Sequence, residues 1–228
     1  MTGLPPVIAI DGPGGAGKGS VAATVAGELG WHLLDSGALY RAVGVSAQRR
    51  GVAEDDTTAL VAMVRSLTFR FTGTGVTVDG EELGDAIRGD AAAATASRVA
   101  ALAPVRAALL AAQRALRMPP GLVADGRDMA TVVFPDALVK VFLTASVEER
   151  ARRRLAQLKQ LKQTGPSVSL PRLLESIRER DERDRTRPVA PLVQAPDAVT
   201  IDSTSLSIEE VARKVLALAA SRQATSTR

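Results

Sequence analysis

The sequence predicts an α/β protein built on a parallel β-sheet. Short apolar runs recur along the chain, and segments with helical patterns separate them. Continuous apolar runs are typical of strands that are buried on both faces, as in parallel sheets covered by helices. The five runs are Val7 to Ile10, Trp31 to Leu34, Leu122 to Ala124, Val139 to Leu143 and Val199 to Ile201. We therefore expect a three-layer core around a five-stranded parallel sheet.

Polar residues follow each of the five runs directly. They are Asp11, Asp35, Asp125, Thr144 and Asp202. Ligands of such sheets bind at the carboxyl ends of the strands. The functional site is therefore expected along this edge of the sheet.

Residues 67–78 depart from the alternation of strands and helices. Leu67 to Phe71 and Val76 to Val78 alternate apolar with polar residues, and the turn Thr72-Gly-Thr-Gly75 joins them. This pattern is typical of a β-hairpin. We expect a small antiparallel insertion here.

A second unusual segment runs from Glu148 to Arg187 and contains 12 of the chain's 29 Lys and Arg residues. Ser146-Val-Glu-Glu149 forms a capping box that starts one helix. Gly165-Pro166 breaks the helical pattern, and Ser169-Leu-Pro171 starts it again. The segment is therefore expected to form two basic helices joined by a turn.

The length of 228 residues favours one principal domain. We expect a core of residues 5–63, 96–147 and 188–220, the antiparallel insertion at about 64–95, and the two basic helices at about 148–187. A capping box at Ser207-Ile-Glu-Glu210 starts the last helix. The composition becomes polar after about Ala220, so residues 221–228 are expected to be a disordered tail.

Composition excludes several classes of protein. The chain has no cysteine and one histidine, His32, which rules out disulfides, thiolate metal sites and multi-histidine metal sites. The amino terminus lacks the pattern of a signal peptide, and no apolar run approaches membrane-spanning length. We expect a soluble cytoplasmic protein.

The charge pattern gives little support to nucleic-acid binding. The sequence pI is about 9.9. The net charge is only +4, however, with four Phe, one Tyr and one Trp available for stacking on bases. We therefore expect neither a nucleic-acid nor a membrane partner.

The segment Asp11-Gly-Pro-Gly-Gly-Ala-Gly-Lys-Gly-Ser20 follows the first apolar run. Its glycines allow successive backbone N–H groups to approach phosphate oxygens, and a helix that starts near Lys18 adds its positive dipole end. The spacing Gly12-x4-Gly17-Lys18 fits a P-loop, with the hydroxyl one place late at Ser20. An ordinary glycine-rich loop is the alternative.

Asp125-Gly-Arg-Asp128 places an arginine between two carboxylates after a strand. Asp125 is suited to hold Mg²⁺ through water, and Arg127 to clamp a phosphate. Asp128 is suited to accept a hydrogen bond from an exocyclic amine such as that of cytosine. The alternative is a simple turn with Asx hydrogen bonds.

Arg180, Asp184 and Arg187 share one face of the second basic helix by helical geometry. Pro188 follows Arg187 and places it at the helix end or just beyond. A solvated Arg180/Asp184 ion pair is one interpretation. Next to a P-loop, the same cluster is suited to neutralise a transferring phosphoryl group.

Five motifs in this order make the chain similar to the bacterial cytidylate kinases. They are Gly12-Pro-Gly-Gly-Ala-Gly-Lys-Gly-Ser20, Leu33-Leu-Asp-Ser-Gly-Ala-Leu-Tyr-Arg41, Asp125-Gly-Arg-Asp-Met129, Thr131-Val-Val-Phe-Pro-Asp136 and Glu179-Arg-Asp-Glu-Arg-Asp-Arg-Thr-Arg187. The resemblance implies a P-loop kinase that transfers a phosphoryl group from MgATP to CMP or dCMP, acting as a monomer. It further implies a nucleotide-monophosphate-binding insertion and an arginine-rich lid at Glu148 to about Pro166.

The resemblance also implies roles for individual residues, of which Lys18, Arg127, Arg187 and Arg153 would be catalytic. The ATP-binding set is Gly12, Pro13, Gly14, Gly15, Ala16, Gly17, Lys18, Gly19, Ser20, Arg150, Arg153 and Arg154. The set around the CMP phosphate is Ser36, Arg41, Arg127 and Arg187. Ser97, Arg106 and Asp128 would face cytosine, and Arg180 and Asp184 would hold the sugar. Ser20 and Asp125 would serve Mg²⁺.

Two positions differ from the usual family pattern. Ala130 stands where glycine is usual, and Ser20 where threonine is commoner. Rival functions are a kinase for another monophosphate, a P-loop switch or GTP-binding module, and an RNA-binding module. The sequence has no Asn-Lys-x-Asp stretch for guanine recognition.

Overall fold

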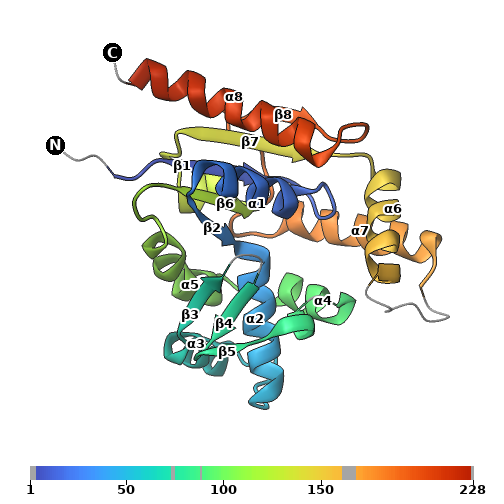
Figure 1. Cartoon of the computed structure of the whole chain (residues 1–228). Helices are drawn as coiled ribbons and strands as arrows, with labels where there is room; N and C mark the ends of the chain where they lie inside the picture. The colour runs from blue at the N-terminus through green and yellow to red at the C-terminus, as the bar shows by residue number, and fades with distance from the viewer. Residues whose placement is uncertain (1–3, 73–74, 88, 161–167, 227–228) are drawn as a thin grey trace.

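The computed structural model describes residues 4–72, 75–87, 89–160 and 168–226 (Figure 1). Its centre is a five-stranded parallel sheet in the order β2-β6-β1-β7-β8. The strands are β1 (Val7–Asp11), β2 (His32–Asp35), β6 (Leu122–Gly126), β7 (Val139–Thr144) and β8 (Val199–Asp202). The predicted α/β class and the five predicted strands are confirmed.

Each strand extends beyond its apolar run to include polar residues at its carboxyl end. Asp11 pairs in register with Gly126, and Asp35 pairs with Asp125. Thr144 pairs with Asp202 on the other side of the sheet. The acids that the sequence places after the strands are thus fixed by the sheet itself.

Helices cover both faces of the sheet, because each strand directs its apolar side chains alternately to one face and to the other. Ile8 and Ile10 of β1 pack under α1 (Lys18–Leu29) and α8 (Ile208–Ser226). Val7 and Ala9 pack on the opposite face. That face is covered by η2 (Met129–Val133), a wide π-type turn, and by the end of α5 (Ala103–Ala115). The three-layer core follows from this alternation.

A second hydrophobic core lies beside the sheet, drawing on buried residues from Ala38 to Leu109. We call the elements around it the α2–α5 body. Its helices are α2 (Ser36–Arg49), α3 (Thr57–Ser66), α4 (Asp90–Val99), α5 and the short 3₁₀ helix η1 (Gly84–Ile87). Its antiparallel sheet is β3 (Phe69–Thr72), β4 (Gly75–Val78) and β5 (Glu81–Glu82).

The predicted antiparallel hairpin is present as β3 and β4, and it gains the third strand β5. Sequence patterns indicated neither β5 nor η1, since both are too short to have a periodicity. The second core is also wider than the insertion expected at about 64–95, because α2 and α5 close it from both sides.

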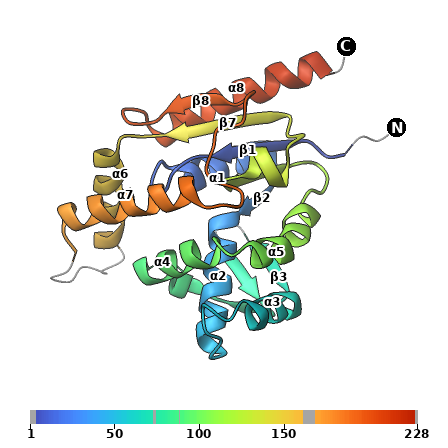
Figure 2. The same cartoon turned by 180° about the vertical axis from the view of Figure 1, so that it is seen from behind.

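The two expected basic helices are α6 (Val147–Gln160) and α7 (Leu170–Thr186). The expected turn at Gly165-Pro166 lies outside the described residues. α7 crosses between the sheet and the α2–α5 body (Figure 2), and α6 packs against α7 through Ala151, Leu158 and Leu173. This arrangement brings the basic segment to the carboxyl edge of the sheet.

The capping box at Ser207 forms completely, whereas the one at Ser146 forms only in part, because the Ser146 amide donates to Thr204 Oγ1 instead of to Glu149. The Ser146 hydroxyl accepts from the Glu149 amide at 3.2 Å, and Ser207 and Glu210 cap each other through two bonds of 2.8 and 3.2 Å. The prediction of a disordered tail from residue 221 was wrong for residues 221–226. Helix α8 continues to Ser226, because Val211, Val215 and Ala219 anchor its preceding turns on the sheet.

Candidate active site

The loop between β1 and α1 has the backbone geometry expected of a phosphate-binding loop. Gly12 has φ +146° and lies so close to β7 that a Cβ atom there would be 1.9 Å from the Leu143 carbonyl oxygen. Gly17 has φ 91° as the residue that precedes α1. Only glycine fits both positions, so the loop can pack on the sheet and open directly into a helix.

Lys18, the first residue of α1, is buried under this loop, and its Nζ donates to the Pro13 carbonyl oxygen at 3.1 Å. It lies 3.6 Å from Asp125 Oδ1 at the end of β6. Burial, followed by the nearby Arg127 charge, lowers the pKa of Lys18 to about 8. The charged form of Lys18 is therefore strongly stabilised when a phosphate group binds beside it.

The carboxylate of Asp125 faces α1 at Gly19, where a larger residue would be in close contact with it. A Cβ atom at Gly19 would lie 3.3 Å from Asp125 Oδ2. Asp125 Oδ1 is buried without a hydrogen-bond partner among the described residues, and burial raises the pKa of this carboxyl. An oxygen ligand with spare acceptor capacity suits a hydrated Mg²⁺ ion. The Ser20 side chain, in contrast, is exposed on the first turn of α1.

Two arginines approach the loop from the opposite side. A Cβ atom at Gly14 would lie 3.4 Å from Nη2 of Arg127 and 3.5 Å from Nη1 of Arg180. Arg127 Nε donates to Asp184 Oδ2 at 2.9 Å, and Arg180 Nε lies 4.0 Å from the same oxygen. The loop and helix α7 therefore meet at an arginine cluster.

Asp184 balances part of this charge. Burial alone would raise the pKa of Asp184, but the guanidinium groups of Arg127 and Arg180 hold it below its ordinary value. Burial and the Arg127 charge lower the pKa of Arg180 to about 10. Two guanidinium groups and one buried carboxylate thus lie beside Gly14, which leaves the cluster with an excess positive charge that an anion would balance.

Asp128 lies at the centre of a second group of charges, further from the loop. Its Oδ2 accepts a short bond from Arg106 of α5, and its Oδ1 lies 3.8 Å from Nη2 of Arg187. The Arg106 guanidinium stands 5.6 Å from the centre of the Tyr40 ring. Arg187 directly follows the last residue of α7, as its position before Pro188 predicts.

Three other predicted residues come from α2 and α4. Ser36 is the buried first residue of α2. Arg41 pairs with Asp35 at 3.4 Å, while its buried Nε has no hydrogen-bond partner among the described residues. Ser97 of α4 is buried, and its hydroxyl accepts from Arg183 Nη1 at 3.0 Å. Sequence reasoning missed Arg183, which lies on the same helix as Arg180 and Asp184.

The predicted lid arginines contact the carbonyl side of the phosphate loop. Arg150 Nη1 donates to the Gly14 carbonyl at 3.1 Å, and its two terminal nitrogens pair with the Asp181 carboxylate at 3.0 and 2.6 Å. Arg153 Nη1 lies 3.4 Å from the Ala16 carbonyl, and its Nη2 donates to the Ser203 carbonyl at 2.6 Å.

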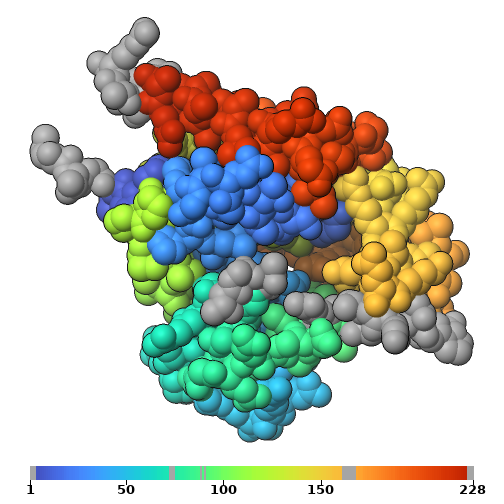
Figure 3. Space-filling model, in the orientation of Figure 1, coloured from blue at the N-terminus to red at the C-terminus, as the bar shows by residue number. Residues whose placement is uncertain are grey.

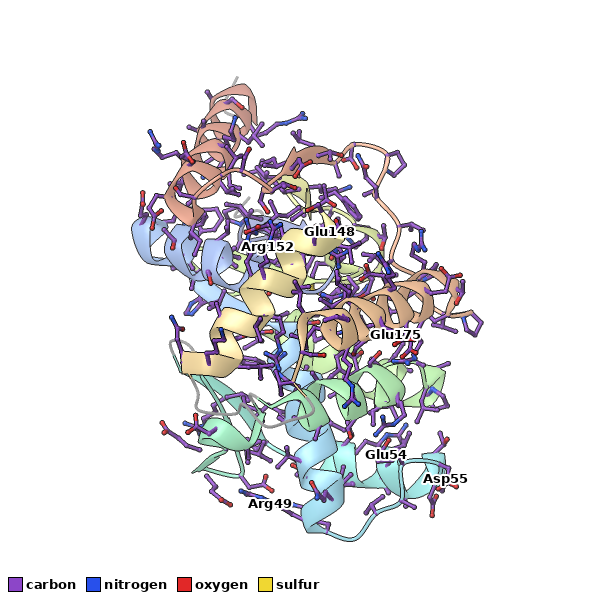
Figure 4. The ribbon with its side chains drawn as sticks, turned by 90° about the vertical axis from the view of Figure 1, so that its right-hand side faces the viewer. Arg49, Glu54, Asp55, Glu148, Arg152 and Glu175 are labelled. Atoms are coloured by element: carbon purple, nitrogen blue, oxygen red, sulfur yellow. The ribbon has the colours of Figure 1, made fainter. Side chains whose placement is uncertain are left out.

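Arg154 is different, since its Nη1 donates to Gln157 on its own helix at 2.7 Å. Asp181 and Ser203, the partners of the two preceding arginines, were not among the predicted site residues. The position of Ser203 directly after β8 was the available signal. Arg152 carries no site contact and projects from the exposed side of α6, as does Glu148 (Figure 4).

All these groups converge on one region of the surface. Figure 3 shows a hollow bounded by the sheet with α1, by the α2–α5 body and by α6. Except for the exposed Ser20, the predicted residues come together here from elements far apart in the sequence, and the charge of Arg154 acts on Arg180.

Comparison with known proteins identifies the family. Residues 8–221 match the family model described as cytidylate kinase, which spans nearly the whole chain. The chain belongs to the cytidylate kinase family. The family resemblance of the five sequence motifs is therefore confirmed.

Curated relatives match over almost their full lengths. The cytidylate kinase of Stutzerimonas stutzeri is 55% identical over 223 residues, which are 95% of this chain and 96% of that protein. The cytidylate kinase of Pseudomonas aeruginosa is 54% identical over 222 residues, with the same coverage of both chains. That of Colwellia psychrerythraea is 53% identical over 219 residues, which are 94% of this chain and 96% of that protein.

Among the described residues, no single helix has both the length and the apolar composition needed to cross a bilayer. The pair 91–99 and 103–115 meets the criterion only when both helices are joined across a 99° bend.

Proposed function

We propose that this protein transfers the γ-phosphoryl group of MgATP to CMP or dCMP and so produces ADP and CDP or dCDP. The observation that carries the proposal is the position of Arg127. Its guanidinium reaches the phosphate loop at Gly14 and also pairs with Asp184 of α7. A single cation therefore spans the gap between a donor site and an acceptor site.

The proposed donor site is the loop and the first turn of α1, with Lys18 at the terminal phosphates and the helix dipole behind them. Its members are Gly12, Pro13, Gly14, Gly15, Ala16, Gly17, Lys18, Gly19 and Ser20, together with Arg150, Arg153 and Arg154 of the lid. The bonds from Arg150 and Arg153 to loop carbonyls support a donor-side role. They hold carbonyl oxygens, which would repel phosphate, on the outer side of the loop.

The proposed acceptor site lies between α7 and the α2–α5 body. Ser36, Arg41, Arg127 and Arg187 would hold the CMP phosphate, and Arg180 and Asp184 would hold the sugar hydroxyls. Buried nitrogens of Arg41, Arg180 and Arg187 have no hydrogen-bond partner among the described residues. Such donors fit an anionic, oxygen-rich ligand.

Base recognition is proposed for Ser97, Arg106 and Asp128. A carboxylate accepts about four hydrogen bonds, and the two neighbouring arginines leave Asp128 with capacity for an amine. Cytosine offers an amino donor beside ring acceptors, which an acid and an arginine together complement. Uracil would present a carbonyl oxygen to the same acid.

The proposed mechanism has no covalent intermediate. Phosphoryl transfer needs an in-line geometry and cations around the three equatorial oxygens. Lys18, Arg127 and Arg187 would supply these cations, with Arg153 from the lid. The carboxylates of Asp184 and Asp128 pair with Arg127 and Arg187, so these guanidinium groups are already oriented before the substrates arrive.

Asp125 and Ser20 are the proposed Mg²⁺ residues. Asp125 Oδ1, which accepts no hydrogen bond among the described residues, fits this role through a water molecule. The exposed Ser20 hydroxyl would have to act from the edge of the site. A bound Mg²⁺ would neutralise charge on the phosphates. We further propose that the protein acts as a cytoplasmic monomer, without nucleic-acid or membrane partners.

The test is a comparison of CMP, dCMP, UMP and AMP as acceptors with MgATP. We expect CMP and dCMP to exceed UMP and AMP in kcat/KM by at least about tenfold, since misplaced polar groups in the base site cost binding energy. A preference for UMP or AMP would support a kinase for another monophosphate. Absence of phosphoryl transfer to all four would reject the proposal.

A further inference from the structure

Asp11 is a buried carboxylate that the proposed mechanism does not use. It is the last residue of β1, directly before the phosphate loop, and only 2% of its surface is exposed. Its two oxygens accept hydrogen bonds from the backbone amides of Met129 and Ala130, each at 2.8 Å. These amides belong to a segment almost 120 residues away in the sequence.

The two amides are the first of the wide turn η2, and the preceding residues are Arg127 and Asp128. Arg127 pairs with Asp184, and Asp128 pairs with Arg106. The carboxylate therefore holds the backbone immediately after both proposed substrate-facing side chains. Because Asp11 also begins the loop, the same residue joins the backbone of the donor site to that of the acceptor site.

The contact uses both oxygens of the carboxylate. Each N–H donates to its own oxygen, and Asn at this position would present an NH₂ group to one of the two donors. Burial raises the pKa of Asp11 to about 6, which leaves the carboxyl mostly ionised at neutral pH. The neighbouring Asp128 adds to this rise, while both amide bonds and the Lys18 charge oppose it.

Ala130 provides one of the two donors and is itself buried against the sheet. Its methyl group packs in the core while its amide bonds to Asp11, so both groups hold the turn in place.

We propose that Asp11 is a positioning residue that sets Arg127 and Asp128 at their working distance from the phosphate loop. The inference rests on the proposed function. It assigns to the end of β1 a role in CMP recognition, although Asp11 itself would touch no substrate.

The first test compares Asp11→Asn with the control Asp136→Asn. Asp136 lies just beyond η2, where its exposed carboxylate pairs with Arg117. In Asp11→Asn one buried N–H faces an NH₂ group and loses its acceptor, so the turn must shift. We expect the KM for CMP to rise at least about tenfold and that for ATP less than about threefold, with reduced discrimination against UMP. Asp136→Asn should match the wild type.

The outcomes are distinguishable. A wild-type protein that phosphorylates no monophosphate rejects the proposed function. An active wild type with an unchanged Asp11→Asn variant overturns the positioning role, and so does an equal rise in both KM values.

A second measurement needs only the wild-type protein, in case Asp11→Asn does not fold. In a pH titration followed by NMR, the amide signals of Met129 and Ala130 should move together with one midpoint near 6, the pKa of Asp11. Both amides should also exchange slowly with solvent. Rapid exchange of both amides in a folded protein would contradict the proposal, because it would show that Asp11 does not hold the turn.

Discussion

Binding of an ATP analogue should be accompanied by uptake of a proton at Lys18. In the free protein, burial and the Arg127 charge lower the pKa of Lys18 to about 8, so about half of the ammonium groups are neutral at pH 8. Phosphate oxygens beside Nζ favour the charged form. The bound protein must therefore hold more protons than the free protein above neutral pH.

The expected size follows from the two titration curves. If phosphate returns the pKa of Lys18 to its ordinary value near 10.5, uptake is about 0.1 proton at pH 7, about 0.5 at pH 8 and about 0.9 at pH 9. By linkage, the association constant should fall about tenfold between pH 7 and pH 9. The sign is fixed, because a pKa that binding raises makes affinity decrease as pH rises.

Calorimetric titration with a non-hydrolysable ATP analogue and Mg²⁺, in buffers that differ in ionisation enthalpy, gives the proton number directly. Lys18→Arg is the control, because a guanidinium stays protonated throughout this range. Wild-type binding without proton uptake at pH 8 to 9 would refute the reasoning. Equal uptake by Lys18→Arg would assign the proton to another group.

Three further predictions concern the site and its support. Lys18→Ala should lower kcat at least about a hundredfold in a folded protein, as a rapid-quench or coupled assay would show. Asp128→Asn should lower kcat/KM for CMP more than for UMP and so reduce the ratio of the two. Arg187→Ala should raise the KM for CMP, whereas Arg153→Ala should raise the KM for ATP. Identical substrate profiles for Arg187→Ala and Arg153→Ala would contradict separate roles. Gly12→Ala should unfold at markedly lower denaturant concentration, since its Cβ atom would lie 1.9 Å from a carbonyl oxygen of β7.

The parts of the fold that could be predicted from the sequence are those with local causes. The five strands were identifiable because buried parallel strands need uninterrupted apolar residues. Ser146 and Ser207 both cap helices as their spacing indicates, and Arg187 leaves the helix because Pro188 follows it. Each of these features depends on residues within a few positions of one another.

The features that sequence reasoning missed depend on contacts between distant segments. The wide turn η2 is held by Asp11, more than a hundred residues earlier, and nothing in its own sequence reveals that partner. Ser97 and Arg183 meet across two helices in the same way. The tail was misjudged because polar composition near Ser226 says nothing of the anchored turns before it.

The same distinction between local and distant causes applies to the candidate site. Which residues gather at the carboxyl edge followed from the positions of the predicted strands and from the motifs. How they pair did not, because each arginine has several acidic neighbours in the sequence. Arg150 pairs with Asp181, and Arg127 with Asp184, because the fold brings α7 to α6 and to the residues after β6.

The junction between β2 and α2 has a mechanical consequence. The strand ends at Asp35 and the helix begins at Ser36, so no loop separates the sheet from the α2–α5 body. The Asp35 carboxylate caps α2 through the Ala38 amide at 2.7 Å and also pairs with Arg41. A rotation of the α2–α5 body about this junction would move Ser36 and Arg41 together with the body. Closing the body over a nucleotide and bringing a guanidinium to its phosphate would then be one movement rather than two.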